Sequence, residues 1–137
     1  MSTIIGIDVG KSGGYAVRKD GNFIECEPFP FVSLVDVYNK FKELIRVYKP
    51  DIIITGKPNR MYNIILRHAQ FIGVISLLGE KNNISVVMVN DTTVRAKIMG
   101  KGNGFNKVGL HELMKGETQD VSDSMSFALY QDVMSNE

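Results

Sequence analysis

Three aspartates have a residue type and spacing that could bind a divalent metal ion. Asp8 stands at the end of a short apolar run at residues 4–7. A carboxylate in a buried strand is costly to leave unpaired, so Asp8 either has a buried partner or binds a cation. Asp120 and Asp123 are three residues apart, which places both on one face of a helix. If the three carboxylates converge, they offer hard oxygen donors suited to Mg²⁺ or Mn²⁺.

Each of these acids could instead have a purely structural role. An acid early in a helix complements the helix dipole, which accounts for Asp120 without a ligand.

The stretch from Gly6 to Ser12 ends in Gly-Lys-Ser, as a phosphate-binding P-loop does, but it has three residues between its glycines. A P-loop needs four residues there and opens a helix, whereas a strand is expected to follow here. The spacing therefore argues against a P-loop, and Asp8 remains either a ligand or a structural residue.

Charged residues are segregated along the chain, although the formal net charge is only +1. Residues 52–79 and 92–111 contain Lys and Arg but no Asp or Glu, whereas acidic residues predominate from 112 to 137. Basic and amide side chains beside the glycines of 100–104 could lie along a phosphodiester backbone, and the alternative is an ordinary solvated surface. The candidates in this second stretch are Thr93, Arg95, Lys97, Lys101, Asn103 and Lys107.

Hydrophobic periodicity predicts the elements that must position these residues. We expect strands at Thr3–Val9, Tyr15–Lys19, Phe23–Pro28, Asp51–Thr55 and Ile84–Val89, the first three forming an antiparallel set. We expect helices from a Ser33 cap to Pro50, from Tyr62 to Leu78 with Gly79 as its end, at Thr92–Met99, at Gly109–Lys115 and at Gln119–Val133 with a cap near Thr118. A glycine-rich loop is expected at Gly100–Gly104. This order predicts a mixed α/β fold around one central sheet.

Composition is that of one globular domain spanning residues 1–137. The chain is 44% hydrophobic and 23% charged, which excludes disordered, collagen-like and coiled-coil proteins. Cys26 is the only cysteine, so no intrachain disulfide forms, and a reducing cytoplasm is the expected compartment. The longest apolar stretch, at 71–78, is too short to cross a bilayer, so we expect no membrane partner.

Four blocks in this order resemble the RuvC-type Holliday junction resolvases, most closely the compact phage-type members. The first is Ile-Gly-Ile-Asp-Val-Gly at 5–10, and the second is the strand at 51–55, which enters a Lys-Pro turn. The third is Thr-x-Arg-x-Lys-x-x-Gly-x-Gly at 93–102, and the fourth is the Asp-x-x-Asp motif at 120–123. Each block alone is weakly specific, but their order and spacing match over nearly the whole chain.

The resemblance implies a ribonuclease H-like α/β fold with a five-stranded mixed sheet flanked by helices, and a homodimer that nicks four-way or branched DNA in pairs. It implies two Mg²⁺ or Mn²⁺ ions per site, with Asp8 binding both ions and Asp120 and Asp123 completing the ligand set. Lys101 and Lys107 match positions near the scissile phosphate. The expected DNA contacts then include Arg95 and Lys97, together with Lys57, Asn59, Arg60 and, against an unpaired base, Tyr62.

Gly56 departs from the family pattern, which has a Glu at the end of the middle strand. Residues 52–79 contain no other acid that could replace it. Because glycine has no side-chain oxygen, we predict a chain that binds junctions but cleaves them poorly or not at all; Gly56 could otherwise be a plain turn residue beside Pro58. The alternatives are a non-catalytic branched-DNA-binding protein and a ribonuclease H acting on RNA–DNA hybrids. The chain is too short for the two-domain nucleotide cleft of actin, heat-shock chaperones and sugar kinases, which share a related strand triple.

Overall fold

The computed structural model describes residues 2–57, 62–99 and 119–135, without the side chains at 62–64, 99, 119 and 120. Its strands are β1 (Thr3–Asp8), β2 (Gly14–Lys19), β3 (Asn22–Pro28), β4 (Ile52–Gly56) and β5 (Ser85–Val89), and its described helices are α1 (Leu34–Tyr48), α2 (Tyr62–Lys81), α3 (Asp91–Met99) and α5 (Gln119–Ser135). The strands form one sheet in the order β3-β2-β1-β4-β5. Strands β1, β2 and β3 pair antiparallel, whereas β4 is parallel to both β1 and β5. The predicted five-stranded mixed sheet is therefore confirmed.

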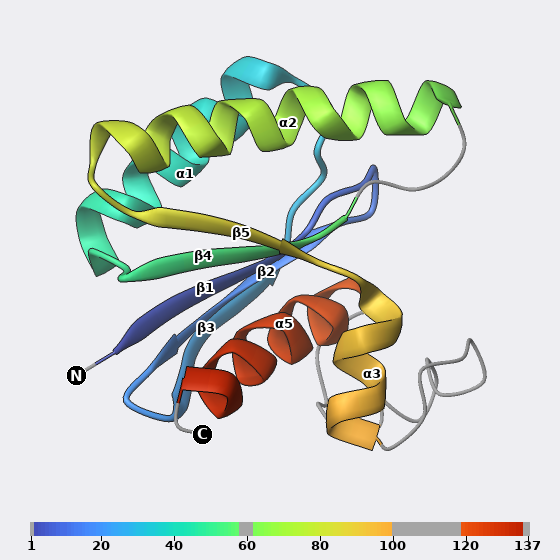
Figure 1. Cartoon of the computed structure of the whole chain (residues 1–137). Coiled ribbons are helices and arrows are strands. Elements are labelled where there is room, and N and C mark those ends of the chain that lie inside the picture. Colours follow the sequence, from blue (N-terminus) through green and yellow to red (C-terminus); the bar gives the residue numbers. More distant parts are fainter. Residues whose placement is uncertain (1, 58–61, 100–118, 136–137) are drawn as a thin grey trace.

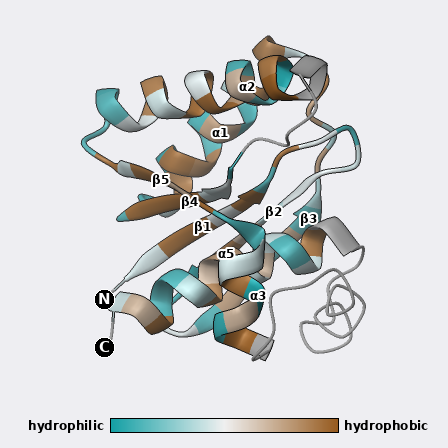
Figure 2. Ribbon diagram, turned by 45° about the vertical axis from the view of Figure 1, so that its right-hand side comes forward, coloured by the Kyte–Doolittle hydropathy of each residue, from teal (hydrophilic) through white to brown (hydrophobic). Residues whose placement is uncertain are grey.

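Helices cover both faces of this sheet (Figure 1). Helices α1 and α2 lie on one face, and α5 with α3 lies on the other. Because side chains alternate along a strand, Ile5 and Ile7 join the core beneath α1 and α2, while Ile4 packs with Phe127 of α5. Figure 2 shows that β1, β4 and β5 are largely hydrophobic. Strands β1 and β4 lie inside the sheet and are mostly buried, whereas β5 is an edge strand whose residues are partly buried or exposed.

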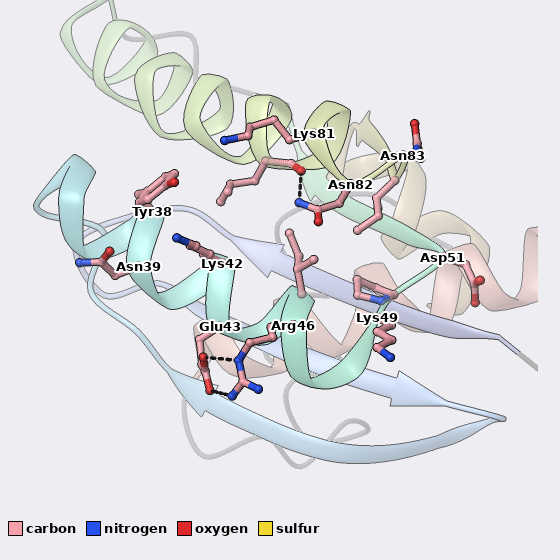
Figure 3. Close-up of a pocket in the computed structure, with 14 residues that line it drawn as sticks. Tyr38, Asn39, Lys42, Glu43, Arg46, Lys49, Asp51, Lys81, Asn82 and Asn83 are labelled. Atoms are coloured by element: carbon pink, nitrogen blue, oxygen red, sulfur yellow. Dashed lines mark hydrogen bonds and ion pairs between the residues drawn. The ribbon is translucent and has the colours of Figure 1, made fainter.

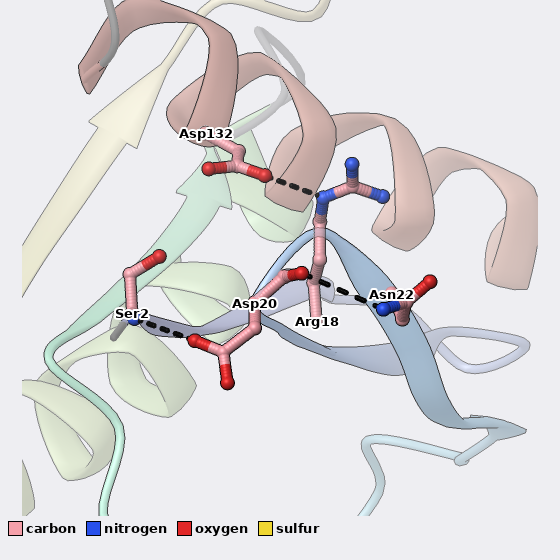
Figure 4. Close-up of polar contacts among 5 residues, drawn as sticks. All are labelled: Ser2, Arg18, Asp20, Asn22 and Asp132. Atoms are coloured by element: carbon pink, nitrogen blue, oxygen red, sulfur yellow. Dashed lines mark hydrogen bonds and ion pairs between the residues drawn. The ribbon is translucent and has the colours of Figure 1, made fainter.

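Helix α5 packs unusually close to β1 because Gly6 has no side chain. A Cβ at Gly6 would lie 2.1 Å from the carbonyl oxygen of Ser124 and 2.8 Å from the backbone nitrogen of Ala128. The other end of the helix is held by an ion pair between Arg18 and Asp132, with 2.8 Å between Nε and Oδ2 (Figure 4). These contacts fix α5 against β1 and β2.

The predicted hairpin and helix cap are confirmed. The β2–β3 turn contains Asp20 at φ 50° and Gly21 at φ 84°, the left-handed pair that favours a tight hairpin. Ser33 caps α1, since its side chain accepts a hydrogen bond from the backbone N–H of Asp36.

The predicted end of α2 is wrong. The helix continues through Gly79 to Lys81, and Asn83 takes the left-handed conformation at φ 57°. Gly79 serves packing instead, because a Cβ there would lie 2.6 Å from Cγ2 of Val86 on β5. The other described boundaries lie within two residues of the predicted ones; for example, β1 ends at Asp8, α3 begins at Asp91, and α5 extends to Ser135. The predicted elements at 100–104 and 109–115 and the cap at Thr118 lie outside the described residues.

No helix in the described part of the chain combines the length and apolar character that a bilayer span requires.

Candidate metal and nucleic-acid site

Three parallel strands end together at one edge of the sheet. The β1–β4 register pairs Ile7 with Thr55, so the next residues, Asp8 and Gly56, are neighbours. The β4–β5 register pairs Gly56 with Val89. Ligand sites in α/β sheets form outside the carboxyl ends of parallel strands, which makes this edge the candidate site.

Asp8 and Gly56 belong to the sheet face that α5 covers. Two residues before Asp8, Gly6 contacts the α5 backbone, and side chains two residues apart in a strand share a face. The Cβ direction of Gly56 also points to α5, toward the ring of Phe127. Asp8 is half-buried, and its backbone N–H donates a hydrogen bond to Oγ of Ser124 at 3.1 Å. The end of β1 is thereby tied to the first half of α5.

Helix α5 brings Asp123 to the same edge. Asp123 precedes the Ser124 that binds β1, and it lies one turn before Phe127, which covers Gly56. Its side chain is buried, with 6% of the residue exposed. The backbone of Asp120 lies in the first turn of α5, and its side chain is outside the described residues. Asp123 thus belongs to the part of α5 that packs against the carboxyl ends of β1 and β4, where Asp8 lies. The role of both residues as metal ligands stays a prediction.

The carboxylates here fit a hard divalent cation by the chemistry of their donors, since Mg²⁺ and Mn²⁺ prefer oxygen ligands. In the described residues, however, no three Asp, Glu, His or Cys side chains are grouped closely enough to hold a metal ion. The described residues thus supply individual candidate ligands but not a complete metal-binding site.

Gly56 is buried. Because it has no side chain, two neighbouring groups lie close to the position that a Cβ would occupy. A Cβ there would lie 3.0 Å from Cζ of Phe127 and 3.4 Å from Oδ1 of Asp91. Asp91 is a residue of this edge that sequence reasoning missed. The available signal was an acid that follows the apolar strand at 84–89, the same pattern that singled out Asp8.

The expected DNA contacts fall into three groups. Lys57, which follows β4 directly, is exposed, and so are Thr93 and Lys97 on α3. Arg95 is instead buried, with 10% of its side chain exposed, and it pairs with Asp91 at 3.6 Å, which differs from the expected contact with a DNA backbone. The remaining candidates lie outside the described side chains, namely Asn59, Arg60, Tyr62, Lys101, Asn103 and Lys107.

His68 lies on α2 beside an apolar cavity of about 570 Å³ that also contacts Gly10 and Lys11, just beyond Asp8. Burial lowers the pKa of His68, and the negative charge of Asp91 opposes that shift.

A larger groove of about 830 Å³ lies at the opposite, amino-terminal ends of the strands (Figure 3). It is lined by the ends of α1 and α2, where Lys42, Lys49 and Lys81 contribute positive charge and Glu43 pairs with Arg46. The groove is therefore separate from the candidate site, because Asp8 lies at the other end of the sheet.

Neither a family model nor a curated protein sequence matches the chain. Solved structures do match. The RuvC of Thermus thermophilus, determined in complex with a Holliday junction substrate, aligns with a TM-score of 0.79 at 11% identity, covering 99% of this chain and 96% of that chain. The fowlpox virus Holliday junction resolvase aligns with a TM-score of 0.61 at 18% identity, covering 98% of this chain and 99% of that chain. The yeast mitochondrial Holliday junction resolvase aligns with a TM-score of 0.53 at 17% identity, covering 98% of this chain and 81% of that chain.

These similarities extend over nearly the whole chain, and therefore over the strands and the helix that carry Asp8 and Asp123. At identities this low they establish the architecture. The chain therefore has the ribonuclease H-like fold of the RuvC-type Holliday junction resolvases.

Proposed function

We propose that this chain is a structure-selective DNA endonuclease of the Holliday junction resolvase type, which binds four-way or branched DNA and makes paired nicks. The observation that supports the proposal is the hydrogen bond that ties Asp8, at the carboxyl end of β1, to α5 at Ser124, the residue after Asp123, in a fold shared with proteins that resolve such junctions. Because fold alone does not determine function, the position of these two acids is essential to the proposal.

Asp8 and Asp123, with Asp120, are the residues that would hold two Mg²⁺ or Mn²⁺ ions. When bound, such ions activate water and offset the charge that develops at phosphorus and at the leaving oxygen. The chain's own contribution is to keep the ligands in place. The hydrogen bond from the Asp8 backbone to Ser124 locks strand to helix, so that the two carboxylates are oriented by rigid elements rather than by loops.

Exposed basic and polar side chains surround this edge and would position the DNA backbone. Lys57 follows β4 directly, and its backbone N–H is fixed by the carbonyl oxygen of Val89 at 2.8 Å. Thr93 and Lys97 are exposed on α3, beside β5. Phosphate contacts of this kind set the register of the DNA without reading its sequence. We propose the same role for Asn59, Arg60 and Asn103, a position near the scissile phosphate for Lys101 and Lys107, and stacking on an unpaired base for Tyr62.

A homodimer would account for paired incisions. A two-fold axis presents two identical sites to two symmetry-related strands of a four-way junction. The two nicks would then be placed by the symmetry of the assembly rather than by two different active sites.

Gly56 favours a second candidate, a branched-DNA-binding protein that does not cut. A middle strand without a carboxylate removes one ligand of the expected set, and metal affinity depends on the number of charged ligands. On the main proposal the same residue weakens cleavage, so a comparison of this chain with Gly56→Glu separates the two candidates.

The test uses a labelled four-way junction and a linear duplex of the same sequence. Binding is measured by gel shift in EDTA, and cleavage is measured in Mg²⁺ and in Mn²⁺. We expect a clear preference for the junction, and symmetric nicks that Gly56→Glu increases and Asp8→Asn abolishes without loss of binding. Asp36→Asn, a change on the distant helix α1, should alter neither measurement.

Equal affinity for junction and duplex would refute the proposal. Junction binding with no cleavage by either this chain or Gly56→Glu would favour the non-catalytic candidate. A competitor RNA–DNA hybrid that displaces the junction would point to a ribonuclease H activity instead.

A further inference from the structure

The cavity beside His68 begins one residue after Asp8, on the other face of the sheet. Side chains alternate along an extended chain, so Val9 packs with the core beneath α1 and α2, whereas Asp8 belongs to the face that α5 covers. The cavity wall includes Val9, Gly10 and Lys11 on one side and residues of α2 on the other. Its volume of about 570 Å³ is in the range of sites for small organic ligands. A group that passes over the strand edge at Asp8 would therefore reach this cavity.

The lining of the cavity is mainly apolar and partly aromatic. Phe31 and Phe71 are each 2% exposed, and their ring centroids lie 5.8 Å apart with an angle of 73° between the planes. Val9 and Val32 add aliphatic surface. An apolar lining of this kind disfavours a hydrated ion and favours an uncharged ring or an alkyl group.

His68 decides between a ring with polar atoms and an alkyl group. Its Nε2 is buried and has no hydrogen-bond partner among the described residues. Burial lowers the pKa of the imidazole, so the ring is mainly neutral at pH 7, and a neutral imidazole can pair with a donor or an acceptor by choice of tautomer. Because an unpaired buried polar atom is costly, a ligand that pairs with it is favoured over an alkyl group. The edge of a nucleobase supplies such a partner.

The two charged side chains among the described lining are both cationic. Lys11 is exposed on a turn that two backbone hydrogen bonds to the carbonyl oxygen of Gly10 hold in place. Arg67 donates to the carbonyl oxygen of Val32, and its guanidinium carbon lies 4.7 Å from the centre of the Phe71 ring. These contacts fix the guanidinium of Arg67 at the cavity. Two cations beside an apolar interior suit a ligand that joins an uncharged ring to a phosphate.

We propose that this cavity receives an unpaired base of branched DNA, with Lys11 and Arg67 on the adjoining phosphate and Nε2 of His68 on the edge of the base. The inference rests on the proposed endonuclease function, and it adds a site for one nucleotide to the stacking proposed for Tyr62. A base is least costly to extrude where its stacking or pairing is already disturbed, as at a branch point. The extruded base would then contribute to the preference for branched DNA over linear duplex.

The experiment uses a four-way junction with 2-aminopurine at the branch point, bound to the full chain in EDTA. The fluorescence of this base rises when the base leaves the stack, so we expect a severalfold rise with the junction and none with linear duplex. His68→Leu removes the ring nitrogens and keeps an apolar side chain. It should reduce the fluorescence rise and weaken junction binding about fivefold, as the loss of one hydrogen bond predicts. Its unfolding temperature should not fall, because the substitution removes an unpartnered buried atom.

A negative charge placed at the cavity provides a second test. Val32 lines the cavity and is 58% exposed, so Val32→Asp adds a carboxylate without disturbing a buried side chain. Because the new charge opposes a phosphate and offsets the cations, junction binding should weaken at least about tenfold. The matched control is Val47→Asp, a change at a residue of α1 that is 51% exposed and does not line the cavity, and it should leave the affinity unchanged. Parent-like affinity in either His68→Leu or Val32→Asp, or no fluorescence rise with the parent chain, would overturn the inference.

The preference for junction over duplex distinguishes failure of this inference from failure of the proposed function. If the parent chain prefers the junction but shows no fluorescence rise, only the role of the cavity is wrong. If the junction is not preferred and free 2-aminopurine nucleotide binds in a manner that depends on His68, the cavity is a site for free nucleotides, and both the inference and the proposed function fall.

Discussion

A side chain added at Gly56 tests the packing between β4 and α5 directly. Its Cβ would lie 3.0 Å from Cζ of Phe127, a residue that is only 3% exposed. The ring belongs to a buried cluster, so it has little room to move away. This cluster contains Ile4, Ile54, Val94, Phe127 and Ala128.

The expected net effect of Gly56→Ala is a modest loss of stability. Overpacking of a well-packed core costs about 1–3 kcal/mol. Removing a glycine from a strand returns about 0.5–1 kcal/mol, because the unfolded chain loses conformational freedom. The balance is a loss of up to about 2.5 kcal/mol, which lowers the unfolding temperature by up to about 10 °C for a domain of this size.

The assay is thermal and urea unfolding of a double-mutant cycle that combines Gly56→Ala with Phe127→Leu. Leucine lacks the ring edge that the new Cβ meets, so Gly56→Ala should be neutral or stabilising in the Phe127→Leu background. A coupling energy of about 1 kcal/mol is expected. Additive effects of the two substitutions, or a higher unfolding temperature for Gly56→Ala alone, would refute the packing argument. The same cycle with Gly56→Glu measures how much stability is lost when the glutamate side chain packs against the Phe127 ring.

Three further predictions address other parts of the molecule. Lys57→Ala should weaken junction binding severalfold and reduce the salt dependence by about one unit of log–log slope, whereas Lys81→Ala, in the distant groove, should change neither. Gly6→Ala should prevent normal docking of α5 and lower stability by more than about 3 kcal/mol in urea unfolding, because the added Cβ meets the Ser124 carbonyl oxygen at 2.1 Å. Burial, reinforced by Glu27, raises the pKa of the Cys26 thiol to about 11, so iodoacetamide at pH 8 should alkylate it much more slowly in folded than in unfolded protein, and equal rates would contradict this.

The fold was largely predictable because its signals are local. Ser33 and the periodic apolar residues after it define α1, and the left-handed Asp20–Gly21 turn defines the first hairpin. Asp8 stood out because an acid in an apolar strand needs a partner or a ligand. Each inference used only a few neighbouring residues, and the structure has the helix, the hairpin and the strand where these residues predict them.

The relation of Asp91 to Gly56 could not be predicted in this way. It depends on the register between β4 and β5, which links residues far apart in sequence. The burial of Arg95 has a similar origin. In α3, Val94 belongs to the buried cluster that contains Phe127 and Ala128 of α5, Ile98 packs against it, and the neighbouring Arg95 is buried as well. Sequence alone shows a basic residue in a basic stretch and therefore favours the exposed alternative.

Helix α5 is the element on which both stability and the candidate site depend. The absence of a side chain at Gly6 lets the helix backbone rest on β1, and that approach is what brings the Ser124 hydroxyl to the N–H of Asp8. At the far end, the Arg18–Asp132 ion pair holds the helix to β2. A shift of α5 large enough to accommodate a bulkier residue at position 6 would also separate Asp123 from Asp8. Substitutions that loosen this helix should therefore reduce metal binding even when they leave every carboxylate in place.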